Sequence, residues 1–426
     1  MKYAEMTKEQ LEKEYSVIRA RYDKLCEEKL SLNLTRGKPE KKQLDLSNEM
    51  YTALNDCDFE MDGIDVRNYG LLDGLPSCKR LFSDILGCAP EEIIIGGNSS
   101  LNLMYDLIAK AYTNGLLHSE RPWCKEEKIK FLCPVPGYDR HFNISISFGM
   151  ECIPVPLHED GPDMDIVEEL VKDPLVKGMW CTPKYSNPDG YIYSSEVRRR
   201  IASLNTAAPD FALIWDNAYA VHCFDGTLPE FPDMIGECRK AGHPDMIYEF
   251  ASLSKVTFAG SGIAALASSQ DNLSHIKKIL TFQTIGFEKV AQYLHVKFLK
   301  DKETILKHME KHAAIMKPKF DAVQNALETE LGSLGIAEWT HPKGGYFVSL
   351  YAMHGTAKRI NSLCAEAGVA MTKAGATYPH GYDPDDSNLR IAPSYPELPD
   401  VVKAMQVLCV SARLAALELL LGKLGK

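Results

Sequence analysis

One lysine of this chain stands in surroundings that suit covalent chemistry. Lys255 follows Ser252 and Ser254 at the end of an apolar run, and a glycine-rich turn begins shortly afterwards at Gly260. A lysine in a pocket loses its proton readily and forms a Schiff base with an aldehyde, and serines beside it can bind a phosphate. A lone lysine is otherwise an ordinary surface residue, so other residues must decide between the two interpretations.

An acidic residue ends a second apolar run. Phe211–Trp215 leads directly into Asp216, and Tyr219 follows three residues later. An aspartate at this point can simply cap a helix. A buried aspartate can also pair with a protonated pyridine nitrogen, which keeps the ring cationic and able to accept electrons. Tyr219 is close enough in the sequence to donate a hydrogen bond to an oxygen on the same ring.

Three further segments have polar residues where a ligand could bind. Asn187-Pro188 followed by Gly190 is a turn signal, and the Asn187 amide can donate to a phenolic oxygen. Gly96–Ser100 separates a short β-branched run from a helix, whose N-terminus suits a phosphate. Arg390 lies in an apolar context, where an arginine binds a carboxylate through two parallel hydrogen bonds or forms an internal salt bridge.

Most of these residues lie beside short apolar runs that alternate with helical segments. Such alternation predicts an α/β fold with a mostly parallel sheet between helices. Ligands bind such sheets at the carboxyl ends of the strands, where the polar residues above fall. The strand candidates are Ile93–Ile95, Lys130–Cys133, Cys152–Pro154, Met179–Thr182, Phe211–Trp215, Ile247–Ala251 and Ile263–Ala267.

The length of 426 residues exceeds what one hydrophobic core usually supports, so we expect two domains. After residue 290 one long helical stretch runs to about Leu331, and a final helix closes a smaller α+β region. A capping box of Thr7 and Gln10 begins an N-terminal helix over 7–28. We expect an N-terminal segment at 1–48 that packs with the small domain, a large domain at 49–305, and a small C-terminal domain at 306–426.

The composition excludes several classes of protein. A net charge of −10 argues against a nucleic-acid partner, although small anionic substrates remain open. The 12 cysteines are scattered without a Cys-x-x-Cys pair, so we expect free thiols and no metal site. The N-terminus lacks a secretory signal, and no run reaches the roughly 18 apolar residues that span a membrane. We therefore expect a cytoplasmic protein.

Taken together, the motifs resemble the fold-type-I pyridoxal-phosphate (PLP) enzymes of the aminotransferase class I/II group. The resemblance extends from about residue 30 to 420, and the order of the motifs carries it. That order is Gly97-Asn98-Ser99-Ser100, Pro136-Gly137-Tyr138, Asn187-Pro188-Asp189-Gly190, Asp216-Asn217-Ala218-Tyr219, Ser252-Leu253-Ser254-Lys255 and Leu389-Arg390.

The resemblance implies pyridoxal 5'-phosphate as the cofactor of a large PLP-binding domain. Lys255 would form the internal aldimine and carry the proton between the substrate Cα and the cofactor. Asp216 would pair with the pyridine nitrogen, and Asn187 and Tyr219 would bond the phenolic oxygen. Tyr138 looks like the aromatic residue that stacks on the ring. Lys255, Asp216 and Tyr219 are thus the implied catalytic residues.

The resemblance also implies a phosphate site and a homodimer with shared active sites. Asn98, Ser99 and Ser100 would hold the phosphate together with Ser252. Tyr69 resembles the tyrosine that reaches the phosphate of the neighbouring subunit. Many relatives also place an arginine shortly after the lysine, but residues 258–263 contain none. Ser261 or a nest of backbone N–H groups is the expected substitute.

For the substrate, the resemblance implies that Arg390 clamps the α-carboxylate, with Asn187 beside it and the Gly37 backbone against the substrate. The segments Thr35–Pro39 and Thr257–Gly262 look closest to a divergent bacterial subgroup of aspartate aminotransferases. That implies ping-pong transamination of L-aspartate and 2-oxoglutarate to oxaloacetate and L-glutamate. Candidate cations for the distal carboxylate are Arg36, Lys38, Arg140 and Lys184.

Two alternatives stay open. An aminotransferase for alanine or aromatic amino acids, or a PLP β-lyase, would keep the fold and have an empty or apolar distal pocket. A PLP-sensing transcription regulator would carry a basic DNA-binding segment before the domain. Here the helix before residue 30 has about as many acids as bases, which disfavours that class.

Overall fold

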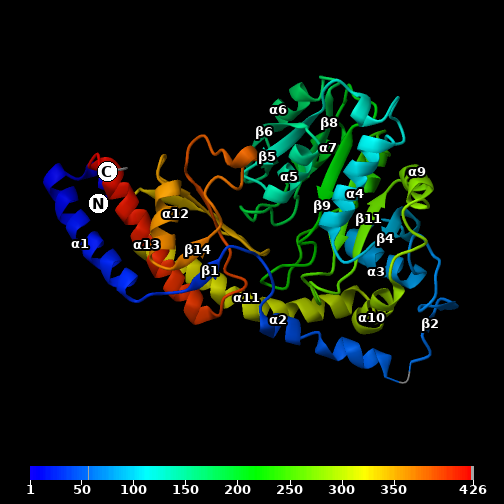
Figure 1. Ribbon diagram of the computed structural model, residues 1–426, viewed down its shortest axis with the longest axis horizontal. Helices are drawn as coiled ribbons and strands as arrows, with labels where there is room; N and C mark the ends of the chain where they lie inside the picture. The colour runs from blue at the N-terminus through cyan, green and yellow to red at the C-terminus, as the bar shows by residue number, and fades with distance from the viewer. Residues whose placement is uncertain (56, 424–426) are drawn as a thin grey trace.

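A large mixed sheet forms the centre of the bigger part of the molecule in the computed structural model, which describes residues 1–55 and 57–423 (Figure 1). Among these residues the sheet has eight strands. In spatial order they are β4 (Ile93–Ile95), β11 (Ala264–Ser268), β10 (Ile247–Ser252), β9 (Ala212–Asp216), β8 (Val176–Cys181), β5 (Lys130–Val135), β6 (Glu151–His158) and β7 (Gly161–Pro162).

The inner strands of this sheet run parallel. β10, β9, β8, β5 and β6 pair in parallel, whereas β11 is antiparallel to both β10 and β4. The α/β fold with a mostly parallel sheet is therefore confirmed, and the two-residue β7 adds an antiparallel strand at one edge. The central strands are buried along their whole length, as their unbroken apolar runs predict for a sheet covered on both faces.

Helices cover both faces, and alternate residues of each strand face opposite layers. On β9, Leu213 and Trp215 pack in one core, whereas Ala212 and Ile214 pack in the other. The first core contains α3 (Pro76–Leu86), α6 (Met164–Leu170), α7 (Ser195–Ala202), α8 (Met234–Lys240) and α10 (Lys289–Leu299). The second contains α4 (Ser100–Thr113), α5 (Asp139–Ser147) and α9 (Gln270–Leu280).

The smaller part contains a three-stranded antiparallel sheet of β12 (Ala337–Trp339), β13 (Val348–Ala352) and β15 (Asn388–Ile391). α12 (Ala357–Glu366) and α13 (Leu398–Leu420) pack with it in one core. The N-terminal helix α1 (Lys8–Glu27) begins at the capping box of Thr7 and Gln10, as predicted, and lies along α13 (Figure 1). β1 (Leu32–Leu34) pairs in parallel with β14 (Val369–Met371).

The predicted long helical stretch after residue 290 is two helices. α10 ends at Leu299, Lys300 has a φ of 57°, and Asp301 caps α11 (Lys302–Leu331). α11 runs from the larger part of the molecule to the smaller part (Figure 1). Its buried apolar residues up to Met309 pack in the first core of the large sheet, and those from Met316 onward pack in the core of the smaller part.

We propose the division of the chain into 1–48, 49–305 and 306–426. The pairing of β1 with β14 supports grouping the first segment with the last. The boundary near residue 305 lies inside the continuous helix α11. Within the described residues, no helix is both long and apolar enough to cross a membrane.

Candidate active site

A cavity of about 560 Å³ opens at the carboxyl ends of four neighbouring parallel strands. Tyr138 follows β5, Thr182 follows β8, Asp216 ends β9 and Ser252 ends β10, and all four line the cavity. The N-terminus of α4 forms another wall, and the segments 35–38 and 371–373 of the smaller part face the cavity as well. The sheet and the smaller part thus build the cavity together, as expected for a ligand site at strand ends.

The structure brings together all the predicted catalytic, cofactor-binding and substrate-binding residues except Tyr69, while the further candidates Ser261 and Lys184 lie elsewhere. Those that line the cavity are Gly37, Asn98, Ser99, Ser100, Tyr138, Asn187, Asp216, Tyr219, Ser252, Lys255 and Arg390. Tyr69 instead lies at the surface, where it is 85% exposed beside Gly70 and Lys289. Its predicted role in the site of a neighbouring subunit stays a prediction.

The two carboxylate oxygens of Asp216 differ in their hydrogen bonding. Oδ2 lies 3.0 Å from Nε2 of His141, which stacks on Trp180 with ring centroids 4.6 Å apart. Oδ1 is buried and has no hydrogen-bond partner among the described residues. A buried acceptor without a donor costs about 1–3 kcal/mol. The free Oδ1 therefore fits a ligand that supplies an N–H group at the floor of the cavity, as a protonated pyridine does.

His141 was not predicted. Its signal was weak, because it follows Tyr138 by three residues on α5 and lies 75 positions before Asp216 in the sequence. The two residues meet only in the folded chain, where the His141 ring on α5 reaches the Asp216 carboxylate at the end of β9.

The surroundings of Lys255 favour its neutral amine. Burial lowers the pKa of the Lys255 ammonium, and the negative charge of Asp216 opposes that shift. Its Nζ lies 4.9 Å from the centre of the Tyr219 ring. Burial raises the pKa of Tyr219 well above its ordinary value, so its phenol stays protonated and can donate. The Ser254 hydroxyl donates to the Asn98 carbonyl at 2.7 Å and joins the lysine segment to the loop before α4.

The wall at the start of α4 suits a phosphate. Ser99 caps this helix and Ser100 is its first residue, so free backbone N–H groups point toward the cavity end of the helix. Ser252 lines the same cavity from β10. Ser261 does not line it, and its hydroxyl lies 3.1 Å from that of Tyr51. Of the two expected substitutes for an arginine, only the backbone N–H groups lie at the wall of the cavity, and their role stays a prediction.

Arg390 lines the same cavity from β15, and it is 7% exposed. Its Nη1 donates to Oδ1 of Asn187 at 3.2 Å, and its Nη2 donates to the Thr372 hydroxyl at 3.2 Å. The carboxylate of Asp139 lies 3.5 Å from Nη1, a long single contact rather than a two-bond clamp. Nε has no partner among the described residues. The guanidinium therefore keeps capacity for an incoming carboxylate.

The candidate cations for a second carboxylate separate into two groups. Arg36, Lys38 and Arg140 line the cavity, and each is largely exposed. Lys184 does not line it, because its Nζ donates to the Ala220 carbonyl at 3.1 Å within the protein interior. Lys373, which directly follows the cavity residue Thr372, lines the cavity and was missed by the sequence analysis.

Comparison with known proteins agrees with this geometry. The family model described as aspartate amino-transferase matches residues 6–424. A Mycolicibacterium smegmatis protein named as an aminotransferase is 46% identical over 99% of this chain and 100% of its own length. An aspartate aminotransferase of Corynebacterium glutamicum is 45% identical over 94% of this chain and 93% of its own.

A solved structure has the same fold as this chain. The crystal structure of an aspartate transaminase from Corynebacterium glutamicum superimposes with a TM-score of 0.96 at 44% identity, covering 98% of this chain and 99% of that one. The fold, the cavity at the strand ends and these matches together show that the chain belongs to the aspartate amino-transferase family and is an aminotransferase with the fold of type I PLP enzymes.

Proposed function

We propose that this chain binds pyridoxal 5'-phosphate and transfers the amino group of L-aspartate to 2-oxoglutarate, giving oxaloacetate and L-glutamate in a ping-pong cycle. One observation carries the proposal: Lys255, the unbonded oxygen of Asp216 and the unbonded Nε of Arg390 all belong to one cavity. The name of the Corynebacterium glutamicum relative supports the choice of substrate.

The residues present fit the cofactor at its pyridine nitrogen and at its phosphate. Asp216 Oδ1 would accept from the pyridine nitrogen, with His141 fixing the other carboxylate oxygen. The N-terminus of α4 and Ser252 would hold the phosphate. When bound, the cofactor supplies an electron sink for the negative charge that develops at the substrate Cα.

Lys255 would then move the proton. Burial favours its neutral amine, so Nζ can take the proton from the substrate Cα and deliver it on the same side of the cofactor. Tyr219 and Asn187 would donate to the phenolic oxygen. Oδ1 of Asn187 accepts from Arg390, which leaves the NH2 group of the same amide to donate, and that group has no acceptor among the described residues.

The substrate would lie between Arg390 and the segment 35–38. Arg390 would bind the α-carboxylate, which replaces the long contact to Asp139 with a stronger charge-assisted pair. A dicarboxylate needs a second cation, and Arg36, Lys38, Arg140 and Lys373 all line the cavity. The four cations favour aspartate over alanine or an aromatic amino acid.

We also propose a homodimer that shares its active sites. Tyr69, Phe282 and Ile285 are 85%, 90% and 64% exposed, an unusual exposure for large apolar side chains. They lie on neighbouring segments, because Lys289 Nζ donates to the Gly70 carbonyl and a side chain at Gly286 would collide with that carbonyl. A second copy of the chain that covers this surface would bring Tyr69 to its phosphate site.

The absorption spectrum of the purified protein with PLP tests the proposal directly. We expect L-aspartate to convert the bound cofactor from its aldehyde-derived band to its amine form, and L-alanine to convert it much less. Conversion by alanine or an aromatic amino acid alone would leave the mechanism and change the substrate. The absence of any bound-cofactor band would contradict the role of Lys255. Sedimentation velocity of the same sample tests the dimer.

A further inference from the structure

A buried row of polar contacts joins the N-terminal segment to α11. The residues from 40 to 47, which include α2 (Lys41–Asp45), run antiparallel to α11 and lie beside it (Figure 1). We call this row the polar seam. Its three contacts are Glu40 Oε2 to Lys319 Nζ at 3.1 Å, Gln43 Nε2 to His312 Nδ1 at 3.2 Å and Ser47 Oγ to His308 Nε2 at 3.2 Å, and all six residues are buried.

Apolar residues would bind the two segments together as well or better. Burying polar and charged groups is costly, and replacing a buried ion pair by apolar side chains is often neutral or stabilising. What directional contacts add is a fixed register, because each donor must meet its own acceptor. The polar seam therefore fixes how far residues 40–47 can slide along α11.

Lys319 connects the seam to the cavity. Besides its contact to Glu40, its Nζ donates to the Ser394 carbonyl at 2.8 Å. The Ser394 hydroxyl in turn donates to the Lys38 carbonyl at 3.0 Å. The Lys38 ammonium lies 3.8 Å from the centre of the Tyr395 ring. Lys319 thus holds both of the segments that fix Lys38.

The other end of the same loop is tied to the substrate arginine. The Thr372 hydroxyl donates to the Thr35 carbonyl at 2.8 Å and accepts from Arg390 at 3.2 Å. Between the two ends, Gly37 packs so closely on Phe347 that a Cβ atom there would lie 2.4 Å from the ring. The loop that carries Arg36 and Lys38 is therefore held at both ends.

We propose that the Glu40–Lys319 ion pair is a positioning device for dicarboxylate recognition: it fixes the height of Arg36 and Lys38 above the cavity relative to Arg390. This inference rests on the proposed function. The distance between two cations decides whether both carboxylates of one substrate are bound at once. Neither Glu40 nor Lys319 lines the cavity, so the pair acts through the loop and not on the substrate.

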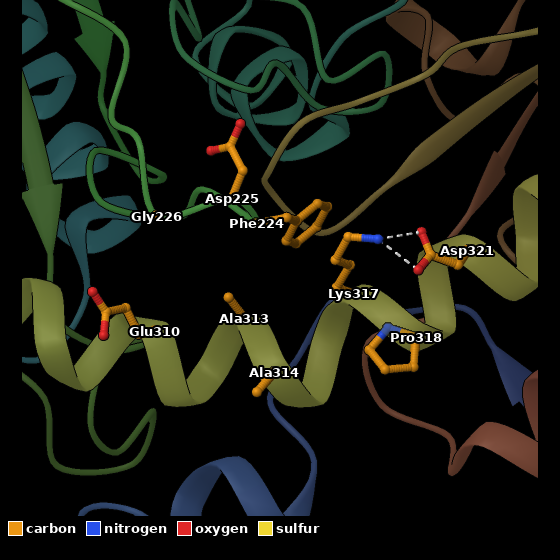
Figure 2. Close-up of a pocket in the computed structure, with 9 residues that line it drawn as sticks. All are labelled: Phe224, Asp225, Gly226, Glu310, Ala313, Ala314, Lys317, Pro318 and Asp321. Atoms are coloured by element: carbon orange, nitrogen blue, oxygen red, sulfur yellow. Dashed lines mark hydrogen bonds and ion pairs between the residues drawn. The ribbon is translucent and has the colours of Figure 1, made fainter.

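The opposite face of α11 offers a matched control. Lys317 forms an ion pair with Asp321 at 2.7 Å, and both side chains are about half exposed. Figure 2 shows this pair beside a hollow lined by Glu310, Ala313 and Pro318, on the side of the helix away from the N-terminal segment. Lys317→Met removes a lysine two positions from Lys319 without touching the seam.

The test compares Lys319→Met, Glu40→Gln and Lys317→Met in the PLP-loaded protein. We expect the first two to raise KM for L-aspartate roughly tenfold, the effect of weakening about one charge-assisted contact, and to leave kcat and KM for L-alanine within about twofold. The dissociation constant of succinate, an unreactive dicarboxylate, should rise by the same factor in calorimetry. Lys317→Met should change none of these values.

A double variant, Glu40→Leu with Lys319→Met, separates positioning from stability. Removing both charges should recover the unfolding midpoint that a single change lowers, while succinate affinity stays weak. If succinate affinity returns with stability, or if Lys319→Met leaves it unchanged, the positioning role is wrong. If the wild type itself does not favour dicarboxylates, the proposed function fails first, and the inference fails with it.

Discussion

The carboxyl group of Asp189 gives the sharpest test of the structure. Asp189 is fully buried in the turn after Asn187, and the Tyr351 hydroxyl donates to its Oδ1 at 2.7 Å. Its other oxygen has no partner among the described residues. Burial raises the pKa of Asp189 from 3.8 to about 7, and the hydrogen bonds from Tyr351 and Ser349 oppose this shift only in part.

The sign of the effect on stability follows from this shift. In the unfolded chain Asp189 ionises near pH 4, but in the folded protein it keeps its proton until about pH 7. The contribution of Asp189 to the free energy of unfolding is therefore most favourable below pH 4. The folded protein loses stability through this group as the pH rises from about 4 to 7. The difference between 3.8 and about 7 corresponds to about 4 kcal/mol at pH 8.

Asp189→Asn removes the ionisation and keeps an oxygen that can accept from Tyr351. We expect the variant to be more stable than the wild type by only about 1 kcal/mol at pH 4.5, where the effect has just begun, and by about 4 kcal/mol at pH 8. Urea unfolding followed by circular dichroism at several pH values measures this, with the exposed Asp84→Asn as the control for net charge. A variant that is less stable than the wild type by the same amount at every pH would refute the reasoning.

Three further predictions concern the cavity. Lys255→Ala should lower kcat by about 10²-fold or more while PLP still binds, and near-normal turnover would contradict its role as base. Arg390→Ala should weaken amino-acid binding by about 2–5 kcal/mol, seen as a higher KM, and an unchanged KM would speak against the carboxylate clamp. His141→Leu removes the hydrogen-bond partner of Asp216 Oδ2, so the affinity for PLP should fall about tenfold in a fluorescence titration. Unchanged affinity would contradict this role of His141.

The sequence predicted the fold class and most of the polar residues that meet in the cavity, the latter through the order of its motifs and their resemblance to a known family. Each apolar run became a strand of the sheet, and residues such as Asp216 and Ser252 stand at strand ends that parallel strands bring to one edge. Lys255, beyond the end of β10, joins them for the same reason. These positions follow from local order along the chain, which is why motif spacing was enough.

Contacts between distant segments were decided only by the tertiary structure. His141 reaches Asp216 across 75 positions, and Lys184 is turned into the interior whereas Lys373 faces the cavity. Neither outcome has a local signal, because the type of a charged residue does not say which way a loop turns it. The same holds for Tyr69, because its sequence neighbours do not predict whether its side chain is exposed.

The polar seam shows most clearly which contacts cannot be predicted from the sequence. Gln43 and Lys319 are residue types that usually face solvent. His312 and Lys319 fall on the buried face of α11 at helical spacing from Met309 and Met316, but this spacing does not say which residues their polar atoms contact. They are buried because the N-terminal segment folds back over α11 and brings each of them a partner of matching chemistry. Hydrophobic periodicity reports which residues avoid water, but a buried polar contact needs two segments at once, and only the folded chain brings those two segments together.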